Sequence, residues 1–204
     1  MTADDRPLVA LITGEPGSGK SVLGANLSRA LRAPFIARDD VRGGLFVTAG
    51  GWSARPRRVP TADEATDTFL HIVESTVGLG VSCVVEYVVR RGRPADLQRL
   101  ATVADCRVLH TWCRDAPGRL ARRNTSDRLL NRRPVLDALG YTSIDEHTSD
   151  AIARMRSVRD EMQTDFDLPV LEVNTDDGYE PGLDLVIDFV VDSDACRSGS
   201  SRWR

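Results

Sequence analysis

Lysine is almost absent from this chain, because 26 of its 27 basic residues are arginine. The sequence also has no apolar run near the roughly 20 residues that a helix needs to span a membrane. Its first seven residues are polar and acidic, unlike a secretory signal. These absences argue against a membrane protein or a membrane partner, and we expect a cytoplasmic protein.

The four cysteines of the sequence have neither CxxC spacing nor the spacing of metal ligands. Three of them lie in apolar, strand-like runs and are expected to be buried thiols, which fits a reducing compartment. The 204 residues contain no internal repeat and no linker. We therefore expect one domain over residues 1–192, with a flexible tail at 193–204.

Charge is distributed unevenly along the chain. Residues 88–133 carry 12 arginines and 4 acidic residues, a net +8, whereas residues 134–204 carry 6 arginines and 16 acidic residues, a net −10. A basic segment in a chain of net charge −3 predicts a local anion site. It does not favour a broad nucleic-acid surface, which usually makes a whole domain basic.

The single lysine lies in a phosphate-binding pattern. Residues 14–21 read G-E-P-G-S-G-K-S, the G-x-x-x-x-G-K-S form of the P-loop. An apolar, strand-like run at 8–13 precedes it and helical spacing over 21–31 follows, so a chance glycine-rich turn is disfavoured. Glycines let backbone N–H groups approach a phosphate, and the helix start adds its positive dipole end. The expected nucleotide-binding residues are Gly14, Glu15, Pro16, Gly17, Ser18, Gly19, Lys20, Ser21 and Val22.

Lys20 and Ser21 have separate expected roles. The Lys20 ammonium would bridge the β- and γ-phosphates of ATP, and the Ser21 hydroxyl would bind Mg²⁺. The pattern predicts binding of a nucleoside triphosphate and a metal, but it does not identify the group that receives the phosphate.

Apolar runs typical of strands alternate with helical spacing along the chain. This alternation predicts an α/β fold, a three-layer P-loop NTPase domain with a five-stranded parallel sheet. The expected strands are 8–13, 35–37, 81–86, 107–112 and 170–174, and the expected helices are 21–31, 63–79, 116–131, 149–163 and 181–191.

The second strand is followed by Arg38-Asp39-Asp40-Val41-Arg42. Ligands of open α/β sheets bind beyond the carboxyl ends of the strands. We predict that Asp39 orients an acceptor hydroxyl and accepts its proton, and that Arg42 holds an anionic or polar part of the acceptor. Alternatively, one of the two aspartates caps the next helix, a role that we assign to Asp40.

The P-loop followed by Arg-Asp-Asp-x-Arg resembles the kinase domain of phage-type polynucleotide kinase. More broadly, the chain is similar to the zeta-toxin, chloramphenicol phosphotransferase and gluconate kinase group of small P-loop kinases. The resemblance covers roughly residues 7–190 and is specific within the first 42. It implies that Asp39 activates the acceptor hydroxyl and that Arg42 binds the acceptor.

The same likeness places an acidic residue at the end of the third strand, and Glu86 is the match. Glu86 would hold Mg²⁺ through a water molecule or lie beside the acceptor hydroxyl, unless it is a surface side chain. Residues 43–60 read as a long loop, either an acceptor wall on which Trp52 stacks against a sugar or base, or a solvated segment. Tyr87 and the turn at 90–93 are expected on the same side of the sheet, within the acceptor pocket.

Arginines gather after the fourth strand, where the resembled kinases have a helical lid. That likeness puts the lid at about 115–148 and implies that its arginines stabilise the transferring phosphoryl group, an effect worth roughly 10³–10⁵ in rate. We assign Arg123 and Arg128 to catalysis and Arg119 or Arg122 to the adenine end of the nucleotide. The alternative is a solvated face paired with the acidic C-terminal third.

The sequence thus predicts a phosphotransferase that uses ATP and Mg²⁺ to phosphorylate a hydroxyl of a small molecule, such as a sugar, nucleoside or antibiotic. Three alternatives stay open: a polynucleotide 5′-hydroxyl kinase, a zeta-toxin-like kinase of an amino sugar, and a nucleotide-dependent regulator without transfer chemistry. The acceptor, the choice of ATP or GTP and the oligomeric state also stay open.

Overall fold

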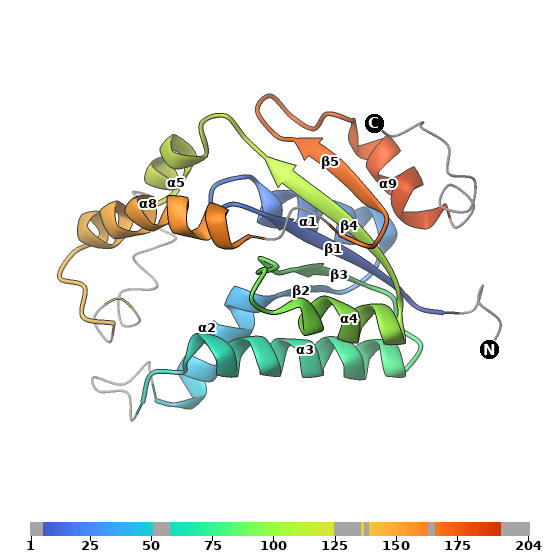
Figure 1. Ribbon diagram of the computed structural model, residues 1–204, viewed down its shortest axis with the longest axis horizontal. Helices are drawn as coiled ribbons and strands as arrows, with labels where there is room; N and C mark the ends of the chain where they lie inside the picture. The colour runs from blue at the N-terminus through green and yellow to red at the C-terminus, as the bar shows by residue number, and fades with distance from the viewer. Residues whose placement is uncertain (1–5, 51–57, 125–135, 137–138, 163–165, 193–204) are drawn as a thin grey trace.

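A parallel β-sheet forms the centre of the molecule (Figure 1). The computed structural model describes residues 6–50, 58–124, 136, 139–162 and 166–192. Within them, five strands pair in the order β2-β3-β1-β4-β5, and every pairing is parallel. The strands are β1 (Leu8–Gly14), β2 (Phe35–Ala37), β3 (Cys83–Glu86), β4 (Asp105–Trp112) and β5 (Val170–Asn174).

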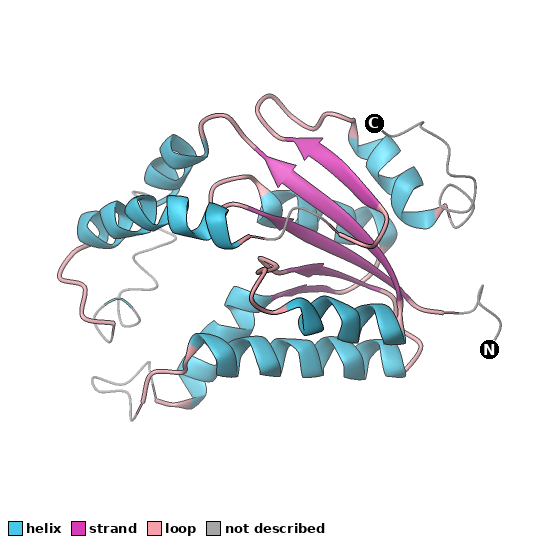
Figure 2. Cartoon of the chain, in the orientation of Figure 1, coloured by secondary structure: helices cyan, strands magenta, loops and turns pink. Residues whose placement is uncertain are grey.

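Helices lie on both sides of this sheet (Figure 2). One hydrophobic cluster joins the sheet to α3 (Ala62–Gly78) and α4 (Pro94–Val103), and a second cluster joins it to α1 (Lys20–Leu31) and α9 (Leu183–Val191). These clusters make the three layers and confirm the predicted α/β P-loop fold. The other described helices are α2 (Arg38–Thr48), α5 (Ala116–Asn124) and α8 (Ile144–Glu161).

Strand β1 is apolar along its length because both of its faces are covered. Val9 and Leu11 pack in the cluster with α3 and α4, whereas Ala10 and Ile12 pack in the cluster with α1 and α9. All four side chains are fully buried. A central parallel strand therefore shows a continuous apolar run rather than an alternating one, which is the signal that predicted this strand.

Helix α4 is absent from the sequence prediction. Its apolar pattern is short, with Leu97 and Leu100 on the face that packs against the sheet. Pro94 occupies the first turn, where its missing N–H costs nothing. The helix supplies the crossover that parallel β3 and β4 require.

The expected loop at 43–60 is partly wrong. Helix α2 continues through Gly43 and Gly44 to Thr48, and Phe46 on it is buried. Burial of that ring outweighs the low helix propensity of the two glycines. Trp52, which was expected to stack on the acceptor, lies outside the described residues.

Capping side chains explain where two helices begin. Ser143 accepts a hydrogen bond from the Glu146 backbone N–H at 3.0 Å, so α8 begins at Ile144 rather than at the predicted residue 149. Thr61 and Glu64 form a capping box at the start of α3. No helix in the described ranges is long and apolar enough to cross a membrane.

Candidate active site

The glycine-rich loop between β1 and α1 has a backbone conformation that leaves no room for a side chain at Gly14 or Gly17. Gly14 and Gly17 adopt φ angles of +141° and +85°. A Cβ atom on Gly14 would lie 2.2 Å from the carbonyl oxygen of Thr111, and one on Gly17 would lie 2.2 Å from that of Ala116. The glycines are therefore required by both conformation and space.

Buried hydroxyl groups tie this loop to the neighbouring strand ends. The Ser18 and Thr111 hydroxyls are 2.7 Å apart, and the Thr175 hydroxyl donates to the Ser18 carbonyl oxygen at 3.0 Å. Lys20 is largely buried, and its ammonium donates to the backbone oxygen of Glu15 at 2.8 Å. The loop is thus held in shape by β4, by the residue after β5 and by its own lysine. Of the other predicted loop residues, Val22 is exposed.

The structure brings together the two residues predicted to meet the metal. The Ser21 hydroxyl donates to Oε1 of Glu86 at 3.2 Å, although the two lie 65 residues apart in sequence. Glu86 ends β3 and pairs in register with Ile12 of β1 and Ala37 of β2, so its carboxylate stands at the carboxyl edge of the sheet. A hydroxyl and a carboxylate are the hard oxygen ligands that Mg²⁺ prefers.

In the described part of the chain, no three His, Cys, Asp or Glu side chains are arranged to hold a metal ion. Mg²⁺ in nucleotide sites does not need such a cluster, because it usually combines one or two protein oxygens with phosphate oxygens and water. The Ser21–Glu86 pair fits that mode of binding.

Helix α2 begins directly at the end of β2 and changes one prediction. Its N-cap is Ala37, which makes no side-chain cap hydrogen bond, so the expected capping role of Asp40 is wrong. Asp39 and Asp40 instead occupy the first turn, where a negative charge favours the helix dipole. The helix starts earlier than expected because Arg38 already has helical geometry.

Asp39 stands at the surface of the site with its side chain 71% exposed. Its carboxylate accepts a hydrogen bond from Arg38 Nη1 at 3.1 Å. The same guanidinium donates to the Ala62 carbonyl oxygen at 2.7 Å and so connects α2 to the start of α3. Arg38 was not predicted as a site residue, and its position beside Asp39 was the only signal for it in the sequence.

Arg42 lies one turn further along α2 and is half-buried. Burial lowers the pKa of its guanidinium, the nearby charge of Arg38 lowers it further, and Asp39 acts in the opposite direction. A partly desolvated cation interacts more strongly with an anion than an exposed one does. The charge of Asp39 thus reaches Arg42 on the same helix, and the predicted binding of the acceptor by Arg42 stays a prediction.

Tyr87 belongs to the core rather than to the surface of the site. Its hydroxyl donates to Oδ2 of Asp96 on α4 at 2.6 Å, and both side chains are buried. Burial, and then the bond to Asp96, raise the pKa of the Tyr87 phenol. Arg93 binds Asp96 as well as Asp63 and Asp67 of α3. This part of the predicted acceptor turn therefore serves to join α3 and α4.

The rest of that turn borders a pocket of about 480 Å³. Its walls come from the start of α3, the β3–α4 turn and the end of α8, and they carry charges of both signs. The charged residues around it are Asp63, Arg90, Arg91, Arg93, Asp160 and Glu161.

The predicted lid arginines separate into distinct environments. Arg119 donates to the carbonyl oxygens of Thr175 and Asp176 at 2.5 Å each, which fastens α5 to the segment after β5. Arg122 is exposed and pairs with Asp115 at 3.0 Å. Arg123 belongs to α5, but its side chain is not among those described, and Arg128 lies outside the described residues.

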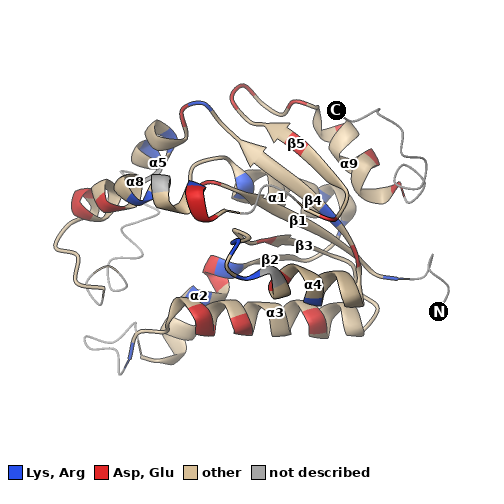
Figure 3. Cartoon of the chain, viewed as in Figure 1, with Lys and Arg blue, Asp and Glu red and all other residues tan. Residues whose placement is uncertain are grey.

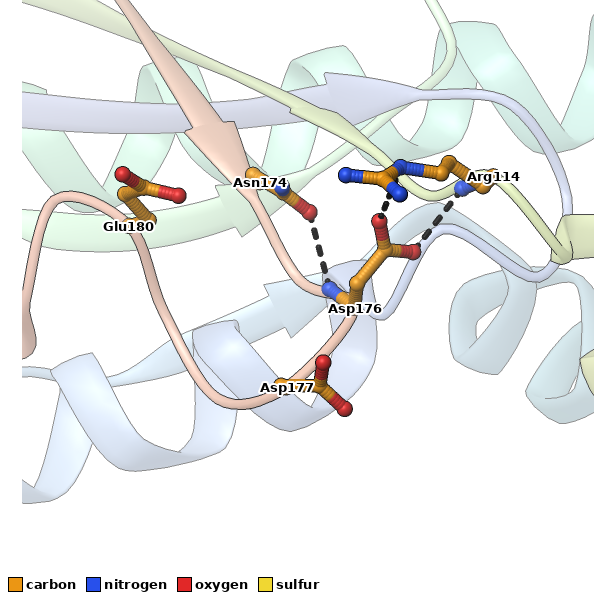
Figure 4. A pocket seen from close by; sticks show the side chains of 5 residues that line it. All are labelled: Arg114, Asn174, Asp176, Asp177 and Glu180. Atoms are coloured by element: carbon orange, nitrogen blue, oxygen red, sulfur yellow. Dashed lines mark hydrogen bonds and ion pairs between the residues drawn. The ribbon is translucent and has the colours of Figure 1, made fainter.

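A second pocket, of about 270 Å³, lies beyond the ends of β4 and β5 (Figure 4). Arg114 binds Asp176 through its backbone N–H at 2.9 Å and its Nε at 3.2 Å, and the Asp176 N–H donates to Asn174 Oδ1 at 2.9 Å. Asp177 and Glu180 complete the lining. Arg114 was expected among the arginines after the fourth strand, whereas the four other lining residues were not predicted, although polar residues after a predicted strand were an available signal.

A protein-family model described as "AAA domain" matches residues 9–162. No curated protein matches the chain.

Several solved structures are similar to this chain. A candidate kinase of Chloroflexus aurantiacus J-10-fl is 22% identical, with 91% of this chain and 97% of that chain covered and a TM-score of 0.65. The APS kinase of Mycobacterium tuberculosis, solved with AMPPNP and APS, is 19% identical over 90% and 97% of the two chains, with a TM-score of 0.54. A gluconokinase of Sinorhizobium meliloti 1021 is 14% identical over 90% and 89%, with a TM-score of 0.52. At these identities the likeness shows a common fold.

Proposed function

Because the chain belongs to the AAA domain family, in its P-loop kinase form, we propose that it is a phosphotransferase that uses ATP and Mg²⁺ to phosphorylate a hydroxyl of a small molecule. The observation that carries this proposal is the 3.2 Å contact between Ser21 and Glu86 beside the phosphate loop. That contact joins a P-loop hydroxyl to a carboxylate from a different strand, as a site for a metal-bound nucleotide requires.

The nucleotide would be held by the chain's own preorganised groups. Gly14 and Gly17 give the loop a backbone conformation in which any side chain would collide with a neighbouring carbonyl oxygen, and backbone N–H groups of such a loop can approach phosphate oxygens. The Lys20 ammonium would exchange its bond to the Glu15 carbonyl oxygen for bonds to the β- and γ-phosphates. Bound Mg²⁺-ATP supplies the γ-phosphoryl group together with the metal charge that offsets the developing negative charge.

Asp39 is the proposed general base. Its exposed carboxylate would accept the proton of the acceptor hydroxyl, while Arg38 holds the carboxylate in place. The acceptor oxygen forms a bond to the γ-phosphorus as the bond to the bridging oxygen breaks, and ADP leaves. Arg42 would bind a polar or anionic part of the acceptor, and Arg123 and Arg128 would stabilise the phosphoryl group in transit.

A pocket whose wall includes Asp63, next to the Ala62 carbonyl oxygen that Arg38 binds, favours a small acceptor. The pocket of about 480 Å³ between α3, the β3–α4 turn and α8 is within the range of small-ligand sites. Its mixed charges suit a polar molecule rather than an apolar one. The gluconokinase and the APS kinase among the similar structures support an acceptor of this size.

A screen for acceptors tests the proposal. ADP or GDP release would be followed with ATP or GTP and Mg²⁺ against sugars, amino sugars, nucleosides, antibiotics and 5′-hydroxyl oligonucleotides. With the acceptor found, Asp39→Asn should reduce transfer by about 10²–10⁴, the usual contribution of a general base, without changing nucleotide affinity. Asp40→Asn is the matched control, since Asp40 lies in the same helical turn, and it should retain transfer.

Each outcome distinguishes a class of function. Normal transfer by Asp39→Asn would refute the assigned base. Transfer to oligonucleotides alone would favour a polynucleotide kinase, and transfer to an activated amino sugar a zeta-toxin-like enzyme. Nucleotide binding with no transfer to any acceptor would favour a regulator.

A further inference from the structure

The phosphate loop contains a carboxylate at its second position. The side chain of Glu15 is only 10% exposed, and its backbone oxygen accepts the hydrogen bond of the Lys20 ammonium. A buried negative charge within a loop that binds a triphosphate opposes binding, because buried charges are screened less by water and salt than exposed ones.

Arg159 of α8 lies against this carboxylate. Its Nη2 and Nε both donate to Oε2 of Glu15, at 2.6 and 3.1 Å. A guanidinium that binds one carboxylate oxygen through two nitrogens makes a strong, charge-assisted pair. The two residues are 144 positions apart in sequence, so only the fold brings them together.

The position of Arg159 is supported by the backbone around it. At the end of α8, the carbonyl oxygen of Glu161 accepts the Arg91 N–H at 2.8 Å, and Met162 forms a bridge with Arg90. On its other side α8 packs on α5 through a cluster that includes Leu120 and Met155. Helix α8 carries charges of both signs (Figure 3). Among the residues that the structure describes, the ion pair of Arg159 with Glu15 connects this helix to the phosphate loop.

We propose that Arg159 is a positioning residue that neutralises Glu15 and thereby allows the phosphate loop to bind a nucleoside triphosphate at full affinity. The inference rests on the proposed function only for triphosphate binding at this loop, and it requires neither a known acceptor nor transfer. It also assigns a role to α8, which connects the lid region to the nucleotide through this charge pair.

A double-mutant cycle tests the role of the pair. Dissociation constants for a fluorescent ATP analogue with Mg²⁺ would be measured for the wild-type chain, Arg159→Gln, Glu15→Gln and the double variant. Arg159→Gln should weaken binding by about tenfold, because it leaves a buried charge beside the phosphates, and added salt should reduce this deficit only in part, because the charge is buried. The double variant should return to within about threefold of the wild type, because the uncompensated charge is then absent.

Arg154→Gln is the matched control. Arg154 lies on the same helix with a side-chain exposure of 63%, close to the 61% of Arg159, but it pairs with Asp150 of its own helix. Its replacement should leave the affinity unchanged. Arg159→Lys, which keeps the charge, should retain most of the affinity, and thermal melts of every variant would separate unfolding from loss of binding.

Three results would overturn the inference. Unchanged affinity of folded Arg159→Gln would show that Glu15 does not oppose binding. A double variant as weak as Arg159→Gln would show that the guanidinium contacts the phosphates directly instead of acting through Glu15. A wild-type chain that binds no better than Lys20→Ala would overturn the proposed function itself, and this inference with it.

Discussion

Replacing Tyr87 with phenylalanine separates a structural role of this residue from the acceptor-binding role that its sequence position suggested. The phenol donates to Oδ2 of Asp96 at 2.6 Å, and the same oxygen accepts from Arg93 Nε at 2.8 Å. Tyr87 and Asp96 are 5% and 4% exposed, so water cannot replace the lost donor. The ring itself packs against Phe69 with centroids 5.6 Å apart, and phenylalanine preserves that contact.

The expected loss can be worked from this geometry. A hydrogen bond to a charged group contributes about 1.5–3 kcal/mol, and a buried acceptor left with one fewer donor loses the full amount. No cavity forms, so no packing energy is added to it. For a chain of 204 residues, 1 kcal/mol corresponds to about 2–4 °C in melting temperature, which predicts a fall of about 3–12 °C.

Urea unfolding and thermal melts would measure the loss of stability, and binding of an ATP analogue should be unchanged. Tyr141→Phe is the control, since it also removes a tyrosine–aspartate hydrogen bond, but Asp150 is 35% exposed and water can take the place of the phenol. Its effect should be less than half as large. A loss below about 0.5 kcal/mol in Tyr87→Phe, together with a raised KM for the acceptor, would refute the core role.

Two further predictions concern the phosphate loop and the segment after β5. Gly17→Ala should destabilise the fold by at least about 1–2 kcal/mol and abolish triphosphate binding, because the φ of Gly17 is +85° and the added Cβ would lie 2.2 Å from the Ala116 carbonyl oxygen. Calorimetry would measure the loss of stability and titration the loss of nucleotide affinity. Near-wild-type binding would contradict the proposed role of the phosphate loop. The Arg114 backbone N–H, and then the Cys113 thiol, lower the pKa of Asp176 below its usual value. A lowered folded-state pKa gives stability that is fully present above the unfolded pKa and is lost as pH falls through the folded pKa. The melting-temperature difference between wild type and Asp176→Asn should therefore stay constant above about pH 5 and shrink as pH falls from about 5 to about 2; a difference that does not change over that range would contradict this reasoning.

The sequence was most informative where the relevant residues are contiguous. The run at 8–13 predicted β1 because a strand covered on both faces is apolar at every position. The glycines, Lys20 and Ser21 follow it directly, so the phosphate loop needs no distant residue for its identification. Glu86 was identified through the resemblance to the small P-loop kinases, which implies an acidic residue at the end of the third strand.

Prediction failed where local preference and tertiary packing disagree. Gly43 and Gly44 disfavour a helix by about 1 kcal/mol each, yet α2 continues through them because Phe46 is buried. Asp40 was expected to cap that helix, but the helix starts at Arg38, immediately after β2. Helix α4 was missed because its apolar face is short and the sheet, rather than its own pattern, stabilises it.

By itself, the sequence determined the α/β class, the P-loop and the kinase family, because these depend on periodicity and on residues that are adjacent in the chain. Only the tertiary structure decided which charges meet. The pairs Ser21 with Glu86 and Glu15 with Arg159 are 65 and 144 residues apart, and the buried Tyr87 hydroxyl donates to Asp96 of α4. Such contacts depend on how strands register and where helices dock, and separation along the chain does not set distance in space.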